Sequence, residues 1–157
     1  MSNEGTESAA ASELAMSFRA GLEEIRNVLA AVPEEWAGES WRAGGWTRKQ
    51  IVGHMLDSAA NNRQRFVRAT IDGHYAGPIY EQQAWVNAHG YAEQEWETLK
   101  RWWEVEHEIL AAVVDRIPEN RLEAKCRVGD AEPVTLRFLI VDYLRHQRLH
   151  AEQLKAG

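Results

Sequence analysis

Residues 45–73 read GWTRKQIVGHMLDSAANNRQRFVRATIDG, and this stretch decides the predicted fold because it contains both ends of one long helix. Thr47 and Gln50 match a capping box, and the flanking tryptophan and isoleucine stand where a hydrophobic staple forms. Gly73 is typical of the residue that ends a helix. We therefore expect a helix over residues 48–71.

The spacing of apolar residues predicts three more helices in the chain. The first covers residues 12–32 and the third covers residues 92–117, and each is followed by a proline that closes it. The last covers residues 136–155, with Thr135 as its expected N-cap. Four helices in one chain indicate a helical bundle.

The segments between the helices complete the predicted architecture. Residues 73–91 are rich in glycine and aromatic residues, which indicates a long ordered loop with one short helical turn. The stretch EAKCRVGDAEPVTLRF, residues 123–138, contains a Gly-Asp turn that favours a short hairpin. We expect a flexible tail over residues 1–11, followed by one all-α, up-down four-helix-bundle domain over residues 12–157, with a short β-hairpin before the last helix.

Composition limits the kinds of partner that the protein can have. Hydrophobic residues make up 45% of the chain, and no apolar run approaches the roughly 20 residues of a membrane span. The formal charge is −6, which does not suit binding to a phosphate backbone. The one cysteine, Cys126, excludes an intrachain disulfide. We expect a soluble, cytoplasmic protein that binds neither membrane nor nucleic acid.

Two histidines stand four positions apart in VDYLRHQRLHAEQL, residues 141–154. The apolar stripe of the last predicted helix passes through Tyr143 and continues to His146 and His150, which predicts that both rings point into the bundle. Rings on neighbouring turns can reach one cation, but a metal site needs a third ligand. His54 is the best candidate. From the residues alone, core histidines without metal remain an alternative.

The capped helix that contains His54, followed some 90 positions later by the last helix with its histidine pair, resembles the DinB/YfiT-like family of small four-helix bundles over residues 12–155. In that family one histidine of the second helix and two of the last helix bind a divalent metal. The resemblance therefore implies that His54, His146 and His150 are metal ligands. Imidazole ligands suit several metals, and we expect zinc or nickel, with iron or manganese as alternatives.

Three imidazoles leave a metal ion with open positions for water and a substrate atom, as in catalytic centres. The resemblance implies a metal-dependent hydrolase, or a transferase that adds a low-molecular-weight thiol to a small-molecule substrate. A metal ion can activate water or hold a thiolate for either reaction. A non-catalytic metal-binding sensor or interaction module is the alternative function. We also expect a homodimer.

Further candidate site residues surround His54 in the sequence. Asp57, one helical turn away, is the nearest carboxylate and would orient a ligand or accept a proton. The alternative for Asp57 is an ordinary solvated helix residue. The candidate substrate contacts are polar residues of the same helix and aromatic residues of the following loop: Asn61, Asn62, Arg65, Tyr80 and Trp85.

The other three histidines fit a metal site less well. His107 lies beside Glu106 in the third predicted helix, and we expect a surface pair there, with a base near a pocket as the alternative. His74 and His89 lie in the long loop, where we expect both to be exposed.

Overall fold

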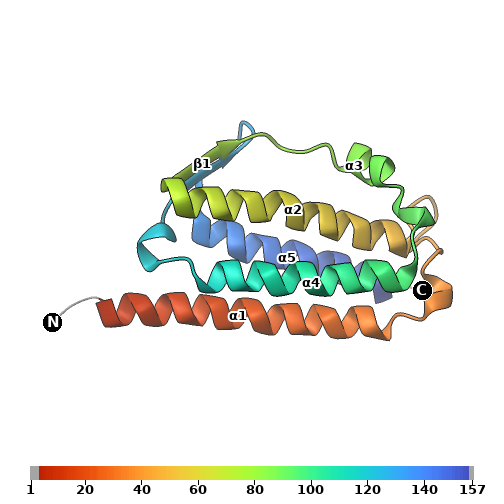
Figure 1. The fold of residues 1–157 in the computed structure, drawn as a ribbon. Coiled ribbons are helices and arrows are strands. Elements are labelled where there is room, and N and C mark those ends of the chain that lie inside the picture. The colour runs from red at the N-terminus through yellow and green to blue at the C-terminus, as the bar shows by residue number, and fades with distance from the viewer. Residues whose placement is uncertain (1–3, 156–157) are drawn as a thin grey trace.

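The computed structural model of the chain describes residues 4–155, and within them it contains a four-helix bundle with a small sheet at one end (Figure 1). The helices are α1 (Glu4–Ala31), α2 (Arg48–Asp72), α3 (Gln82–His89), α4 (Trp96–Asp115) and α5 (Leu136–Lys155), and the strands are β1 (His74–Gly77), β2 (Lys125–Val128) and β3 (Val134–Thr135). Both α1 and α2 pack against α4 and α5, so α1 and α2 occupy opposite corners of the bundle.

The predicted four-helix bundle is present, but its long helices do not strictly alternate in direction along the chain. Figure 1 shows α1 and α5 running from left to right, whereas α2 and α4 both run from right to left. The connection with β1 and α3 produces this order, because it carries the chain back along the bundle to the end where α2 begins. As a result α2 and α5 are antiparallel neighbours.

Both predicted ends of α2 are confirmed. The Thr47 hydroxyl accepts a hydrogen bond from the Gln50 backbone N–H at 3.2 Å, and the Gln50 side chain accepts one from the Thr47 N–H at 2.9 Å. Gly73 ends the helix with φ of 77°, a left-handed conformation that glycine adopts without steric cost. The helix is thus fixed in place at both ends.

The first helix is longer than predicted. It begins at Glu4, whereas the apolar stripe predicted a start at Ser12, so residues 4–11 of the expected tail are helical. Three alanines and two glutamates in this segment are good helix formers, and propensity extends the helix where no apolar stripe exists. Residues 1–3 lie outside the described part of the chain.

The predicted hairpin is confirmed, but it belongs to a three-stranded sheet. Strand β2 pairs antiparallel with β3 and parallel with β1, in the order β1-β2-β3. The expected loop over residues 73–91 therefore contains a strand, and α3 has eight residues instead of a single turn. A four-residue strand whose partner lies some fifty positions away leaves little periodicity in the sequence.

The predicted N-cap of α5 is confirmed, because the Thr135 hydroxyl accepts a hydrogen bond from the Phe138 N–H at 3.0 Å. The predicted buried stripe of α5 is wrong in its second half. After Tyr143 the buried face continues through Gln147 and Ala151, whereas His146 is exposed and His150 is half-buried. A stripe of apolar residues could not reveal this, because the buried residue at 147 is polar.

Gln147 is fully buried and ties three helices together next to the histidines. Its amide donates to the Met55 carbonyl at 3.1 Å, and its side-chain oxygen accepts from the Trp103 indole at 3.1 Å. Nearby, the Arg48 Nε donates to the Leu154 carbonyl at 3.0 Å, close to the end of α5. These bonds fix the position of α5 along α2, and therefore which side chains of the two helices face each other.

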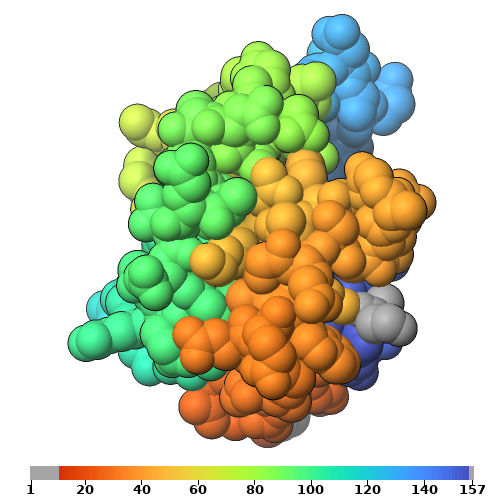
Figure 2. All heavy atoms as spheres, turned by 90° about the vertical axis from the view of Figure 1, so that its right-hand side faces the viewer, coloured from red at the N-terminus to blue at the C-terminus, as the bar shows by residue number. Residues whose placement is uncertain are grey.

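The segment over residues 33–47 closes the end of the bundle where α2 begins. Figure 2 shows this segment, in orange, beside the connection and the start of α4, in green. Trp46 donates from its indole to the Gln83 side chain at 3.0 Å, which joins the segment to α3. None of the helices in residues 4–155 has the length and apolar character that crossing a bilayer requires.

Candidate functional site

A cavity of about 360 Å³ lies between α2 and α5, and all three histidines predicted as ligands line it. The connection after α2 and strand β2 contribute to its wall. Its lining residues are His54, Ser58, Asn62 and Arg65 from α2, Tyr80, Gln82 and Val128 from the connection and β2, and Leu139, Asp142, Tyr143, His146 and His150 from α5.

His54 is the most buried of the three histidines, with 5% of its surface exposed. Its ring lies 4.6 Å from that of His150 and 4.9 Å from that of Trp46, measured between centroids. Burial lowers the pKa of His54 to about 4, and the neighbouring histidines act in the same direction. The ring is therefore neutral near pH 7, and its buried Nδ1 has no hydrogen-bond partner within the described residues.

His150 is oriented by a neighbour on its own helix. Its Nδ1 lies 2.9 Å from the side-chain oxygen of Gln153. An amide oxygen only accepts hydrogen bonds, so Nδ1 carries the proton and Nε2 keeps its lone pair. Burial lowers the pKa of His150, which favours this neutral form.

His146 is the most exposed of the three, with 48% of its side chain exposed. Its Nδ1 lies 3.5 Å from one carboxylate oxygen of Asp142. The other oxygen of Asp142 pairs with Arg145 at 2.8 Å. A carboxylate beside one ring nitrogen leaves the other nitrogen available as a ligand, an arrangement common in metal sites. Asp142 is thus the carboxylate associated with the histidines, a place that we had assigned to Asp57.

The chemistry of the three histidine side chains suits a divalent metal ion. His54 and His150 are neutral imidazoles in ring contact, and the unpartnered Nδ1 of His54 is a buried polar atom that a ligand bond would satisfy. In position the set is incomplete: as the side chains of residues 11–155 stand, no three His, Cys, Asp or Glu side chains are close enough to hold an ion. His146 would have to rotate toward the other two rings.

Three of the five predicted substrate contacts also line the cavity. They are Asn62 and Arg65, from α2, and Tyr80, from the connection that follows α2. Asn61 does not line the cavity, and its side chain donates to the Asp57 carbonyl at 2.9 Å. Trp85 is also absent from the lining, although its ring lies 5.3 Å from that of Tyr80 and supports it from outside.

Asp57 is buried, with 2% exposed, so it is not an ordinary solvated helix residue. One of its carboxylate oxygens accepts from the Tyr91 hydroxyl at 2.6 Å, and the His89 Nδ1 lies 3.2 Å from it. Burial raises the pKa of Asp57, while the Tyr91 bond and the His89 charge oppose that change. His89 is largely exposed, as predicted, but it takes part in this contact.

Glycine at position 53 makes the contact between Asp57 and Tyr91 possible. A Cβ at Gly53 would lie 2.0 Å from the Tyr91 ring, so only glycine lets this ring lie directly on α2. Asp57 does not line the cavity of the histidines. Its bond with Tyr91 ties the segment after α3 to α2.

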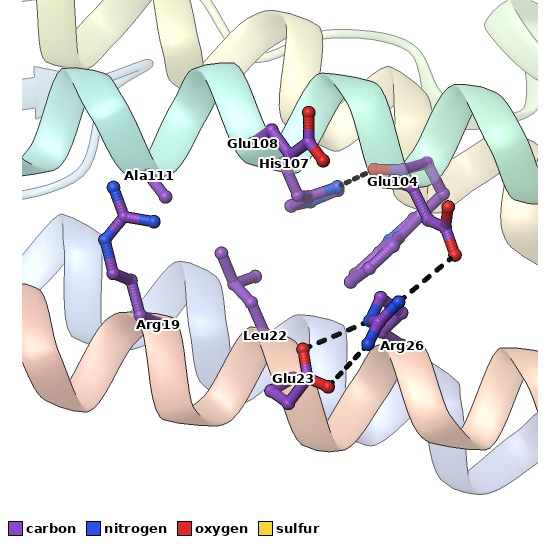
Figure 3. A pocket seen from close by; sticks show the side chains of 9 residues that line it. Arg19, Leu22, Glu23, Arg26, Glu104, His107, Glu108 and Ala111 are labelled. Atoms are coloured by element: carbon purple, nitrogen blue, oxygen red, sulfur yellow. Dashed lines mark hydrogen bonds and ion pairs between the residues drawn. The ribbon is translucent and has the colours of Figure 1, made fainter.

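A second cavity, of about 260 Å³, lies between α1 and α4 and is drawn in Figure 3. His107 forms part of its wall and is only 2% exposed, so the expected surface pair with Glu106 is wrong. Its Nδ1 donates to the Trp103 carbonyl at 2.7 Å, and its Nε2 accepts from the Tyr143 hydroxyl at 2.6 Å. His74, by contrast, is exposed as predicted.

Several lining residues were not predicted from the sequence, and Asp142 and Tyr143 are the most informative of them. Asp142 precedes His146 by four positions, and this spacing could have identified it as the carboxylate beside a ligand. No pattern in the sequence indicates that Gln82 and Val128 reach the cavity, because they come from the connection and the sheet.

Fold and site together define a class of protein: a four-helix bundle with histidines from its second and last bundle helices on one internal cavity. The DinB superfamily profile matches residues 17–154 of this sequence. The chain therefore belongs to the DinB superfamily, as the resemblance of its motifs had implied.

Two solved structures share the fold. YfiT from Bacillus subtilis, described as a probable metal-dependent hydrolase with an unusual four-helix bundle topology, matches with a TM-score of 0.80 and 18% identity over 92% of this chain and 83% of its own. The mycothiol-dependent maleylpyruvate isomerase matches with a TM-score of 0.78 and 17% identity over 93% of this chain. This chain covers 61% of that isomerase. No curated protein sequence is significantly similar.

Proposed function

We propose that the protein is a divalent-metal-dependent enzyme that acts on a small molecule, as a thiol S-transferase or a hydrolase. The observation that carries this proposal is the set of three histidines, His54, His146 and His150, on one cavity between two antiparallel helices. Zinc or nickel is the expected metal, because imidazole nitrogens suit both. Iron and manganese are alternatives.

The histidines hold the ion, and their neighbours orient them. Gln153 fixes the ring of His150, and Asp142 stands beside the ring of His146. The bound ion would supply an activated water or a stabilised thiolate at neutral pH. Tyr80 and Asn62 line the same cavity and would contact the substrate, while Asp57 acts through Tyr91 as a positioning residue for the connection above it.

The two structural relatives support both reaction classes. YfiT is described as a probable metal-dependent hydrolase, and the isomerase is described as mycothiol-dependent. One protein with this fold is thus described as a probable metal-dependent enzyme, and another as an enzyme that depends on a thiol.

Metal binding is tested first, by elemental analysis of the purified protein and by thermal-shift titration with Zn²⁺ and Ni²⁺. We expect about one ion per chain and a rise in melting temperature that His146→Ala abolishes. His74→Ala is the matched control, because this histidine is exposed and does not line the cavity. Absence of binding by the wild-type protein would remove the basis of the proposal.

Catalysis is tested next, since a non-catalytic sensor or interaction module would bind the metal equally well. Metal-loaded protein is assayed with glutathione, bacillithiol and mycothiol against a panel of electrophiles, and with ester and amide substrates for hydrolysis. We expect metal-dependent turnover that His146→Ala abolishes and His74→Ala preserves. Metal binding without turnover across the whole panel would favour the sensor.

We also propose a homodimer. Three large apolar side chains on the outer face of α5, Phe138, Val141 and Leu149, are each more than half exposed. Light scattering coupled to size exclusion measures the state directly. We expect twice the chain mass for the wild type and the single chain mass for Val141→Glu.

A further inference from the structure

Arg65 is a buried cation on the wall of the histidine cavity, with 8% of its surface exposed. The one hydrogen bond found for its guanidinium in residues 4–155 is a long one, from Nη2 to the Pro78 carbonyl at 3.4 Å. No carboxylate of the described residues forms an ion pair with it. A buried guanidinium with most of its donors unused is costly unless a ligand satisfies it.

The acidic groups near Arg65 have other partners. Asp142 lines the same cavity, but it binds Arg145 at 2.8 Å and stands 3.5 Å from His146. Asp57 accepts from Tyr91 and lies beside His89. The positive charge of Arg65 is therefore left for a molecule that enters the cavity.

Tyr80 adds a second donor to the same region. Burial raises the pKa of Tyr80 to about 12; Asp57 adds to the rise, and a Ser58 hydrogen bond and the Arg65 charge oppose it. The phenol thus keeps its proton at neutral pH and can donate a hydrogen bond. A guanidinium beside a phenol is a suitable pair of donors for a carboxylate.

The position of Arg65 along the helix indicates the shape of the ligand. It follows His54 by eleven residues, which places their Cα atoms roughly 16 Å apart along the helix axis at about 1.5 Å per residue. Because α5 is antiparallel to α2 (Figure 1), the early part of α2 with His54 faces the later part of α5 with His150, and Arg65, near the end of α2, faces the first part of α5. The cavity therefore has a histidine end and a cationic end.

We propose that Arg65 and Tyr80 bind the carboxylate of an elongated small carboxylic acid whose other end reaches the three histidines. This inference rests on the proposed function, because it takes the histidine end to be the reactive end. It adds the substrate class: an organic anion. The step is binding alone, through charge-assisted hydrogen bonds from the guanidinium and the phenol.

The test compares benzoate with benzamide, a neutral molecule of the same shape, on metal-free protein. Titration calorimetry or ligand-observed NMR gives the dissociation constants. We expect benzoate to bind about tenfold more tightly than benzamide, as a charge-assisted pair predicts. Arg65→Gln should reduce this preference to less than about twofold, whereas Arg68→Gln, on an exposed arginine of the same helix, should leave it unchanged.

Equal binding of the two probes to the wild type, or an unchanged preference in a folded Arg65→Gln protein, would overturn the inference. Circular dichroism establishes whether the variant folds. If it does not, Tyr80→Phe is the second variant: a several-fold weaker benzoate preference supports the inference, and no change contradicts it. Because no metal is present, a negative result here leaves the metal proposal intact, and failed metal titration leaves a positive benzoate result intact.

Discussion

Two cavities of the bundle contain buried histidines with opposite hydrogen-bonding states. Between α1 and α4, His107 uses both nitrogens, one toward Trp103 and one toward Tyr143, and Arg26 in the same wall pairs with Glu23 and Glu104 (Figure 3). Between α2 and α5, the Nδ1 of His54 has no partner in the described residues. Burial alone thus does not distinguish the two histidines; the unsatisfied imidazole nitrogen of His54 does, and it is the reason for proposing His54 as a ligand.

The largest expected effect is on metal binding. His54→Ala should weaken Zn²⁺ affinity by roughly 100-fold or more, because loss of residues that only support a ligand already costs tenfold to 100-fold. His107→Ala should leave the affinity within about threefold of the wild type. Titration against a chelating indicator measures both, and equal losses in the two variants would contradict the distinction between the cavities.

The histidine that matters little for metal binding, His107, should matter much for the stability of the fold. His107→Ala should lower the free energy of unfolding of metal-free protein by about 3 kcal/mol, because it leaves a core void and removes the acceptor of the buried Tyr143 hydroxyl. Urea denaturation at pH 7 measures the change. His74→Ala, at an exposed position, serves as the control and should change the free energy by less than about 0.5 kcal/mol.

Much of the fold could be predicted because it depends on local signals. The capping box at Thr47, the glycine at position 73 and the N-cap at Thr135 each act through neighbouring backbone groups, and all three are confirmed. Strand β1 depends on a partner some fifty residues away, and the parallel course of α2 and α4 depends on the path of a whole connection. Neither leaves a local pattern.

The candidate site could likewise be predicted only in part from the sequence. His54, His146 and His150 were found from their spacing and family resemblance, and they do line one cavity. The sequence could not show that Gln147, and not His146, occupies the buried face of α5, because that glutamine is buried through two specific hydrogen bonds. Nor could it show that Asp57 is engaged by Tyr91 and His89, which come from a distant segment.

Acid should narrow the stability difference between wild type and His107→Ala. Burial lowers the pKa of His107 to about 4 in the folded protein, against 6.5 for an ordinary histidine. The unfolded chain therefore binds the proton first, and the stability contributed by the neutral ring, present above pH 6.5, is lost as pH falls toward 4. The loss amounts to at most about 3 to 4 kcal/mol, because the two pKa values differ by about 2.5 and each pKa unit corresponds to about 1.36 kcal/mol.

Urea denaturation of metal-free protein at several pH values between 7 and 4.5 tests this difference. The free energy of wild type minus that of His107→Ala should shrink steadily on acidification, and other titrating groups common to both proteins cancel in the subtraction. A difference that stays constant between pH 7 and 4.5 would show that His107 is protonated in the folded protein or exposed to water.

The smallest expected change in Zn²⁺ affinity distinguishes a residue that orients a ligand from a residue that is itself a ligand. Asp142→Asn keeps the shape of the side chain but removes the charge beside the His146 Nδ1, so Zn²⁺ affinity should fall about tenfold, less than for loss of a ligand. Asp115→Asn removes a comparable carboxylate that pairs with Arg19 on the opposite side of the bundle, and it should leave the affinity unchanged. If Asp142→Asn abolished binding as completely as His54→Ala, the carboxylate would itself be a ligand, and His146 would be the residue that supports it.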